Sequence, residues 1–263
     1  MQKSITKESL TLAINLVEPL QCLLFLGSII SLWIITGILK EKQILCESDS
    51  RKINHIAVFV GGALAFGWLP ELTARVNLYI VSTIILTLVI LTCRYKDTNP
   101  FSYIYSANAR ASDSPNTTFF FWSSWCLSIA ALATIDLLFT DMTVTRTALL
   151  IVGIADGIAE PIGKRFGKHC YAVFSFSPFS LNNKPSFRTN SFRSVEGSFA
   201  VWITTLLVIL FSAHALSFWH QSLAAIAIAS VITLVEALSP RGCDNFSILL
   251  TAAILTQSLL TTN

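Results

Sequence analysis

Long runs of hydrophobic residues, separated by polar segments, dominate the chain. The runs are continuous rather than alternating, which favours membrane-spanning helices over the strands of a barrel. A helix needs about 20 mostly apolar residues to cross hydrocarbon about 30 Å thick. Runs of this kind lie at 20–39, 54–69, 78–93, 119–139, 144–162, 197–216, 221–238 and 246–261. The pattern therefore predicts an all-α, polytopic integral membrane protein with about eight transmembrane helices.

Composition supports a membrane protein with a single domain. The chain of 263 residues is 53% hydrophobic and only 13% charged, whereas soluble domains average about 25% charged residues. No small-residue cleavage site follows the first run, so this run is expected to stay in the protein as a span. The chain has no detectable internal repeat and no loop that fits a soluble domain. Residues 1–263 are therefore predicted to form one membrane domain.

Neither the net charge nor the cysteines indicate a further class of partner. A net charge of +3 is too small to indicate nucleic acid binding. The six cysteines lie far apart, with no C-x-x-C pair and no cluster with histidine. No zinc site and no disulfide framework are predicted.

Lysine and arginine are distributed unevenly between the two sides that the eight runs define. The segments after the first, third, fifth and seventh runs hold fourteen of the 18 Lys and Arg residues, and the opposite side holds four. These residues concentrate on the cytoplasmic side of a membrane. Both termini are therefore predicted to lie outside, and the four rich segments are predicted to lie in the cytoplasm.

The segment 150–169 carries the sharpest chemical pattern. Asp156 and Glu160 are four residues apart, so one helical face carries both carboxylates at the cytoplasmic end of the fifth run. Charged residues within a membrane helix are costly and usually mark a site. Gly153 and Gly157 form a small-residue face that lets another helix or a ligand approach the backbone.

A cationic patch follows directly, formed by Lys164, Arg165, Lys168 and His169. Mg²⁺ binds through one or two carboxylates together with phosphate oxygens. Asp156 and Glu160 beside this patch are therefore candidate magnesium ligands near a triphosphate. The alternative interpretation is that both acids are interfacial charges paired with Lys164 and Arg165.

The segment 193–198 reads Arg-Ser-Val-Glu-Gly-Ser. Ser194 can cap the helix that follows, and Gly197 allows close backbone approach. By itself, capping explains this segment as well as a binding site does.

The segment 235–246 gathers polar residues at the end of the seventh run. It holds Glu236, Arg241, Asp244 and Asn245 around a turn with Pro and Gly. A turn needs no such group of side chains, so their density indicates a site.

Two other polar positions receive a simpler interpretation. Arg51, Lys52 and His55 stand at the entry of the second run, where cations usually determine topology. His55 is expected to be an interfacial histidine rather than a catalyst. Asp136 lies in the fourth run near the opposite side, and it is interpreted as a packing residue.

Taken together, these segments resemble the CTP-dependent lipid kinases. That family includes dolichol kinase, phytol kinase and fungal-type diacylglycerol kinase, and it is distantly related to phosphatidate cytidylyltransferases. The run 155–169 is similar to the family's Asp-Gly-x-Ala-Glu-x-x-Gly-x-x-(Phe)-Gly core, and 194–198 and 242–245 are similar to its Lys-Ser-x-Glu-Gly-Ser and Gly-x-Asp-Asn patterns. Arg51-Lys-x-x-His55 also matches. Order and rough spacing agree over about residues 51–246, the expected catalytic core.

The resemblance implies a lipid-alcohol kinase that uses a nucleoside triphosphate, CTP with Mg²⁺, and a long-chain isoprenoid alcohol or diacylglycerol as acceptor. On the family pattern, Asp156, Glu160 and Asp244 are the catalytic residues, and Asp156 and Glu160 are the metal ligands. The implied nucleotide-binding and phosphate-binding residues are Lys164, Arg165, Lys168, Arg193, Ser194, Glu196, Gly197, Arg241 and Asn245.

Two departures and two rival functions stay open. Arg193 stands where the family commonly has Lys. The phenylalanine-rich segment 171–192 is long, and it is interpreted as a membrane-surface segment, a cover for the nucleotide or a disordered insertion.

A cytidylyltransferase making a CDP-lipid is the nearest rival, although its C-terminal signature is absent. A transporter is the second, although transporters usually hold polar groups near the bilayer midplane. The acceptor, CTP against ATP, the host membrane (bacterial inner membrane, or eukaryotic endomembrane or plastid) and the oligomeric state stay undetermined.

Overall fold

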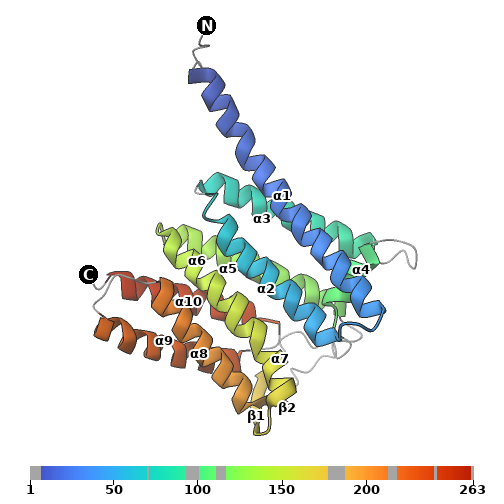
Figure 1. Ribbon diagram of the computed structural model, residues 1–263, viewed down its shortest axis with the longest axis vertical. Helices are drawn as coiled ribbons and strands as arrows, with labels where there is room; N and C mark the ends of the chain where they lie inside the picture. The colour runs from blue at the N-terminus through green and yellow to red at the C-terminus, as the bar shows by residue number, and fades with distance from the viewer. Residues whose placement is uncertain are drawn as a thin grey trace.

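The structure is a computed structural model that describes residues 7–69, 71–92, 101–110, 117–176, 187–212, 218–239 and 242–261. Its helices pack into a bundle (Figure 1). They are α1 (Lys7–Glu41), α2 (Glu47–Ala65), α3 (Leu72–Thr92), α4 (Phe101–Asn108), α5 (Thr117–Leu138), α6 (Met142–Leu150), the π-helical turn η2 (Ile151–Asp156), α7 (Gly157–Phe166), α8 (Val195–Ser212), α9 (Phe218–Leu238) and α10 (Asp244–Thr261). The fold class is therefore that of an all-α membrane protein, as predicted.

The predicted number of spans is corrected from eight to six. In the described residues, six helical segments are long and apolar enough to cross a membrane: Pro19–Glu41, Leu72–Leu91, Thr117–Leu138, Met142–Phe166, Val195–Ser212 and Trp219–Leu238. The runs at 54–69 and 246–261 do form helices, α2 and α10. They fall short because α2 begins with charged turns and the apolar part of α10, Asp244–Leu260, is brief.

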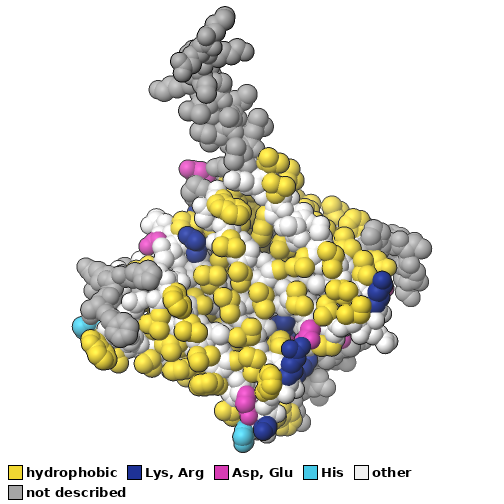
Figure 2. Space-filling model, viewed as in Figure 1, with side chains coloured by type: hydrophobic (Ala, Val, Ile, Leu, Met, Phe, Trp, Pro, Cys, Tyr) yellow, Lys and Arg dark blue, Asp and Glu magenta, His cyan; other side chains and the backbone are white. Residues whose placement is uncertain are grey.

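Large hydrophobic side chains are exposed along the sides of the bundle. Figure 2 shows them over most of the face in view, with charged side chains toward its ends. Leu24 of α1, Leu88 of α3 and Phe211 of α8 are each more than half exposed. Soluble monomers rarely expose such continuous apolar surface, so the exterior agrees with a multi-pass membrane protein.

The segment Met142–Phe166, formed by α6, η2 and α7, is the centre of the bundle. Ile151 and Val152 are fully buried within its hydrophobic core. The segment contacts α2 on one side and α8 and α10 on another. It therefore connects the N-terminal helices to the C-terminal ones.

Gly153 and Gly157 let α2 pack directly against this central segment. A Cβ atom at Gly153 would lie 2.9 Å from the Cβ of Phe59, and one at Gly157 would clash with the side chain of Ile56. The predicted small-residue face is confirmed, and the element that approaches it is a helix. The π-helical turn η2 ends at Asp156, and such turns within α-helices are rare and often lie at functional sites.

A β-hairpin lies between α7 and α8 at one end of the bundle (Figure 1). Its strands, β1 (Cys170–Phe176) and β2 (Phe187–Ser194), are antiparallel, and Cys170 pairs with Ser194. The hairpin is a short addition to the helical bundle that the sequence pattern did not predict. The roles considered for 171–192 stay open, because residues 177–186 lie outside the described residues.

Replacing Gly157 by leucine is expected to force α2 away from the central segment. The new side chain would meet Ile56, and inserting extra methylenes into a packed interface costs about 1–3 kcal/mol. Thermal unfolding in detergent should therefore show a lower midpoint. Gly27→Leu in α1 is the matched control, because no atom lies within 4 Å of a Cβ there. Equal losses from both variants would contradict close packing at Gly157.

Candidate functional site

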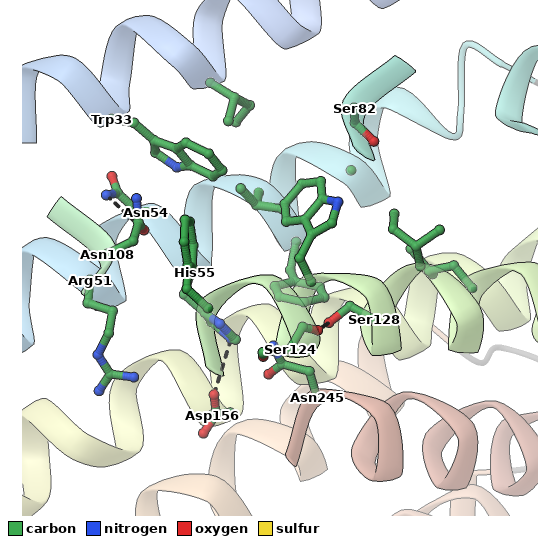
Figure 3. Close-up of a pocket in the computed structure, with 18 of the residues that line it drawn as sticks. Trp33, Arg51, Asn54, His55, Ser82, Asn108, Ser124, Ser128, Asp156 and Asn245 are labelled. Carbon is green, nitrogen blue, oxygen red and sulfur yellow. Dashed lines mark hydrogen bonds and ion pairs between the residues drawn. The ribbon is translucent and has the colours of Figure 1, made fainter. Parts of the chain in front are cut away.

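Asp156 lies at the end of η2 among side chains that α2 contributes. The Nζ of Lys52 donates to Oδ2 of Asp156 at 2.9 Å and to its carbonyl oxygen at 2.8 Å. The Nε2 of His55 lies 3.2 Å from the same Oδ2 and 3.0 Å from the carbonyl oxygen of Val152. Figure 3 shows His55 directed toward Asp156. Lys52 and His55 are three residues apart, which places them on one face of α2.

Both members of the Lys52–Asp156 pair are buried, with 4% and 6% of their surfaces exposed. Taking charges out of water costs several kcal/mol for each ion unless partners and hydrogen bonds compensate. Two of the three N–H donors of Lys52 are used on Asp156. The Val152 carbonyl can only accept, so Nε2 of His55 carries a proton in this geometry. The carboxylate of Asp156 is thus held in a fixed orientation.

Glu160 lies one turn further along, on α7, and cations surround it. Arg51 of α2 forms an ion pair with it, Lys164 approaches to 2.8 Å, and Arg110 approaches to 3.8 Å. The interpretation that pairs Glu160 with Lys164 is therefore confirmed for this acid. Asp156 pairs instead with Lys52 of α2.

The predicted cationic patch lies on the outer surface of this end of the bundle. Lys164 and Arg165 are more than half exposed, and Arg165 pairs with Asp49 at 2.6 Å. The backbone N–H of Lys168 donates to Glu196 at 3.0 Å. These three cations are not part of the cavity lining described next.

Asp156 lines a cavity of about 200 Å³ that extends between α1, α2, α3 and α5 (Figure 3). Its polar end is lined by Arg51, Lys52, Asn54, His55, Asn108, Arg110, Asp156, Asp244 and Asn245. The other walls are mostly apolar, with aromatic rings from Trp33, Phe59, Phe121 and Trp125 among them. A cavity of this kind can hold a molecule with a polar head and a hydrocarbon chain.

The structure brings part of the predicted site together at this cavity. Asp156, Asp244 and Asn245 line its polar end. Glu160 reaches it through Arg51, which lines the cavity and pairs with Glu160. The first and third polar segments of the sequence thus meet, although they are separated along the chain.

The segment 193–198 has a structural role in the described contacts. Ser194 caps α8, because its Oγ accepts from the Gly197 N–H at 3.0 Å. A Cβ at Gly197 would lie 2.9 Å from the carbonyl oxygen of Ala159, so α8 packs directly on α7. Glu196 accepts from the backbone N–H of Lys168. None of these residues lines the cavity.

Arg193 forms an ion pair with Glu236 of α9, which is 2% exposed. This pair joins the hairpin to α9 away from the cavity lining. Arg241, the remaining predicted phosphate ligand, lies outside the described residues. Its place in the site stays a prediction.

The segment 51–55 contributes more to the site than its sequence indicates. Cations at the entry of an apolar run are expected to determine topology, whereas Arg51 and Lys52 both pair with the acids of the central segment. The signal was present in the spacing of Lys52 and His55 on one helical face and in the short match to the family pattern. Arg110 gave no signal, because a polar loop offers no periodicity.

Magnesium binding by Asp156 and Glu160 stays a prediction. Both carboxylates are already neutralised by Lys52, Arg51 and Lys164. Among the described residues, no three His, Cys, Asp or Glu side chains converge as a metal site. These residues do not fit a resident metal ion in this arrangement.

Replacing Lys52 by methionine is expected to destabilise the fold strongly. Removing one partner of a buried ion pair costs about 3–5 kcal/mol, whereas replacing both by apolar residues is often neutral. The double variant Lys52→Met/Asp156→Leu should therefore recover most of the stability, as measured by denaturant unfolding. Lys164→Ala, which removes an exposed partner of Glu160, should cost only about 0–1 kcal/mol. A Lys52→Met protein as stable as the wild type would contradict a stabilising pair between Lys52 and Asp156.

Comparisons with protein-family models, with curated proteins and with solved structures found no match for this chain.

Proposed function

We propose that this chain is a membrane-bound lipid-alcohol kinase that transfers a phosphoryl group from a nucleoside triphosphate, CTP in particular. The observation that carries the proposal is the cavity, which is charged at one end and apolar along its other walls. A lipid alcohol is divided in the same way, with one hydroxyl and a long hydrocarbon chain. The motifs shared with CTP-dependent lipid kinases supply the type of reaction.

In the proposed reaction the acceptor hydroxyl lies beside Asp156. Its oxygen attacks the terminal phosphorus of the triphosphate, the bond from that phosphorus to the bridging oxygen breaks, and the nucleoside diphosphate leaves. The hydroxyl proton passes to the carboxylate of Asp156, whose orientation is fixed by Lys52 and His55. Positioning and charge neutralisation are the main contributions of an enzyme to phosphoryl transfer.

The cations at the polar end are proposed to hold the phosphates. Arg51 and Arg110 line the cavity, so they can stabilise the charge that develops on the transferred group. Asp244 and Asn245 complete the polar end. The three cations of the outer patch, Lys164, Arg165 and Lys168, are proposed to bind the rest of the nucleotide. Arg193, which pairs with Glu236, is proposed to assist them. Mg²⁺ arriving with the triphosphate would neutralise further phosphate charge.

Asp156→Asn is expected to reduce phosphoryl transfer by at least about 100-fold, because an amide cannot accept the hydroxyl proton and positioned bases contribute about 10²–10⁴ in rate. The assay follows labelled CTP or ATP with a panel of lipid alcohols in mixed micelles. Glu71→Gln is the matched acid-to-amide control, since Glu71 is exposed just before α3. This control should keep wild-type activity.

The products separate the kinase from its rivals. A nucleoside diphosphate together with a phosphorylated lipid supports the kinase. Pyrophosphate together with a CDP-lipid would identify a cytidylyltransferase instead, and full activity of Asp156→Asn would remove Asp156 from the mechanism. Transport of a solute without turnover of nucleotide would favour the transporter.

The polar end is proposed to face the cytoplasm, because Arg51, Lys52 and Arg110 gather there and cations concentrate on the cytoplasmic side of a membrane. Cys170 is exposed at this end, so in a variant that retains only this cysteine an impermeant maleimide should label it after permeabilisation alone. Thr140→Cys, in the exposed turn between α5 and α6, should be labelled in intact cells. Labelling of Cys170 in intact cells would reverse the sidedness.

Cys243 has to be absent from that variant, although it reacts slowly. It is half-buried beside Asp244. Burial raises the pKa of its thiol, and the negative charge of Asp244 raises this pKa further. The thiolate is the reactive form, so a raised pKa slows labelling.

A further inference from the structure

The cavity follows one face of α2 along nearly its whole length. Arg51, His55, Phe59, Gly62 and Phe66 all line it, at the spacing of successive helical turns. Fifteen residues at about 1.5 Å each give the cavity a length of roughly 22 Å. One leaflet of membrane hydrocarbon is about 15 Å thick, half of the whole. The lining along α2 is therefore comparable in length to the tail of a membrane lipid, with the polar end where the head of the lipid would lie.

We propose that Phe66 and Tyr79 form a floor that sets the longest hydrocarbon chain the cavity accepts. This inference rests on the proposed function for the identity of the occupant, a lipid alcohol. Both residues line the end of the cavity opposite Arg51, and both are buried. Their ring centroids lie 6.1 Å apart, so the two rings lie side by side at this end.

An ion pair below the rings fixes the floor. Tyr79 donates its hydroxyl hydrogen to Asp136 at 2.8 Å, and Nε of Arg75 donates to the same carboxylate oxygen at 3.1 Å. The Arg75 guanidinium lies 5.8 Å from the centre of the Phe66 ring and also donates to the carbonyl oxygen of Leu69 at 3.2 Å. The floor therefore joins α3, α5 and the turn after α2.

This network makes it costly for a longer lipid tail to displace the rings of the floor. Arg75 and Asp136 are buried, and separating a buried pair leaves uncompensated charge. Swinging Tyr79 aside would also break its hydrogen bond to Asp136. Asp136, which the sequence indicates as a packing residue, thus also helps to position the lipid tail in this proposal.

The cavity is small for two hydrocarbon chains side by side, with a volume of about 200 Å³. The aromatic walls are also fixed, since Trp33 packs edge-on against Phe121 and Trp125 at centroid distances of 6.3 and 6.0 Å. The fitting occupant is a lipid alcohol with a single tail.

Two variants move the floor in opposite directions. Phe66→Ala opens space below the present end of the cavity. Gly62→Leu fills the cavity one turn above the floor. The atom nearest to a Cβ at this position is Cδ2 of Leu149, at 3.9 Å, so the fold should tolerate the substitution. Phe211→Ala on the exposed surface of α8 and Gly27→Leu on α1 are the matched controls.

The experiment measures the binding of straight-chain primary alcohols of graded length to the full-length protein in micelles, without nucleotide. Affinity, calculated from the concentration of free alcohol in the aqueous phase, should rise about fourfold for each added methylene until the tail reaches the floor, and then stop rising. Phe66→Ala should shift this limit to longer alcohols and Gly62→Leu to shorter ones, with both controls at the wild-type limit. An unchanged limit in Gly62→Leu would overturn the proposal.

The binding experiment also separates this inference from the kinase. Shifted length limits in a protein that phosphorylates no alcohol would support the floor and reject the kinase. Phosphoryl transfer whose chain-length preference is identical in the wild type and in Gly62→Leu would support the kinase and reject the floor. Diacylglycerol that binds as tightly as the best single-chain alcohol would reject the single-tail occupant.

Discussion

The buried ion pair between Lys52 and Asp156 is the contact on which the polar end depends. It holds the charged beginning of α2 against the central segment, at a place where either ion alone would be strongly unfavourable. Gly153 and Gly157 make the approach possible by leaving no side chain in the way. Once α2 is held there, its next turns form a wall of the cavity.

The polar motifs of the sequence divide into two physical tasks in the fold. Some members, such as Asp156 and Asp244, line the cavity. Others, such as Ser194 and Gly197, begin α8 and let it pack on α7. The segment 193–198, which joins β2 to α8, thus resembles a binding loop in sequence although its residues cap α8 and pack it against α7.

Hydropathy located every long helix, because continuous apolar runs leave few alternatives in hydrocarbon. It miscounted the spans at α2, whose first turns are charged, and at α10, whose apolar part is brief. The acids of the central segment were recognisable because charge inside an apolar run stands out. The identity of the partner of Asp156 was not, since Lys52 lies 104 residues away and pairing across helices has no local signal. The cavity is likewise a product of packing among α1, α2, α3 and α5.

That separation along the chain has a consequence for biosynthesis. Lys52 is made 104 residues before its counter-ion, so α2 leaves the ribosome with a cation that hydrocarbon does not tolerate alone. Until the central segment is made, the charged turns of α2 are more stable in the headgroup region, with only the apolar end of the helix immersed. The final packing of α2 is then a late assembly step, which couples completion of the polar end to synthesis of the second half of the chain.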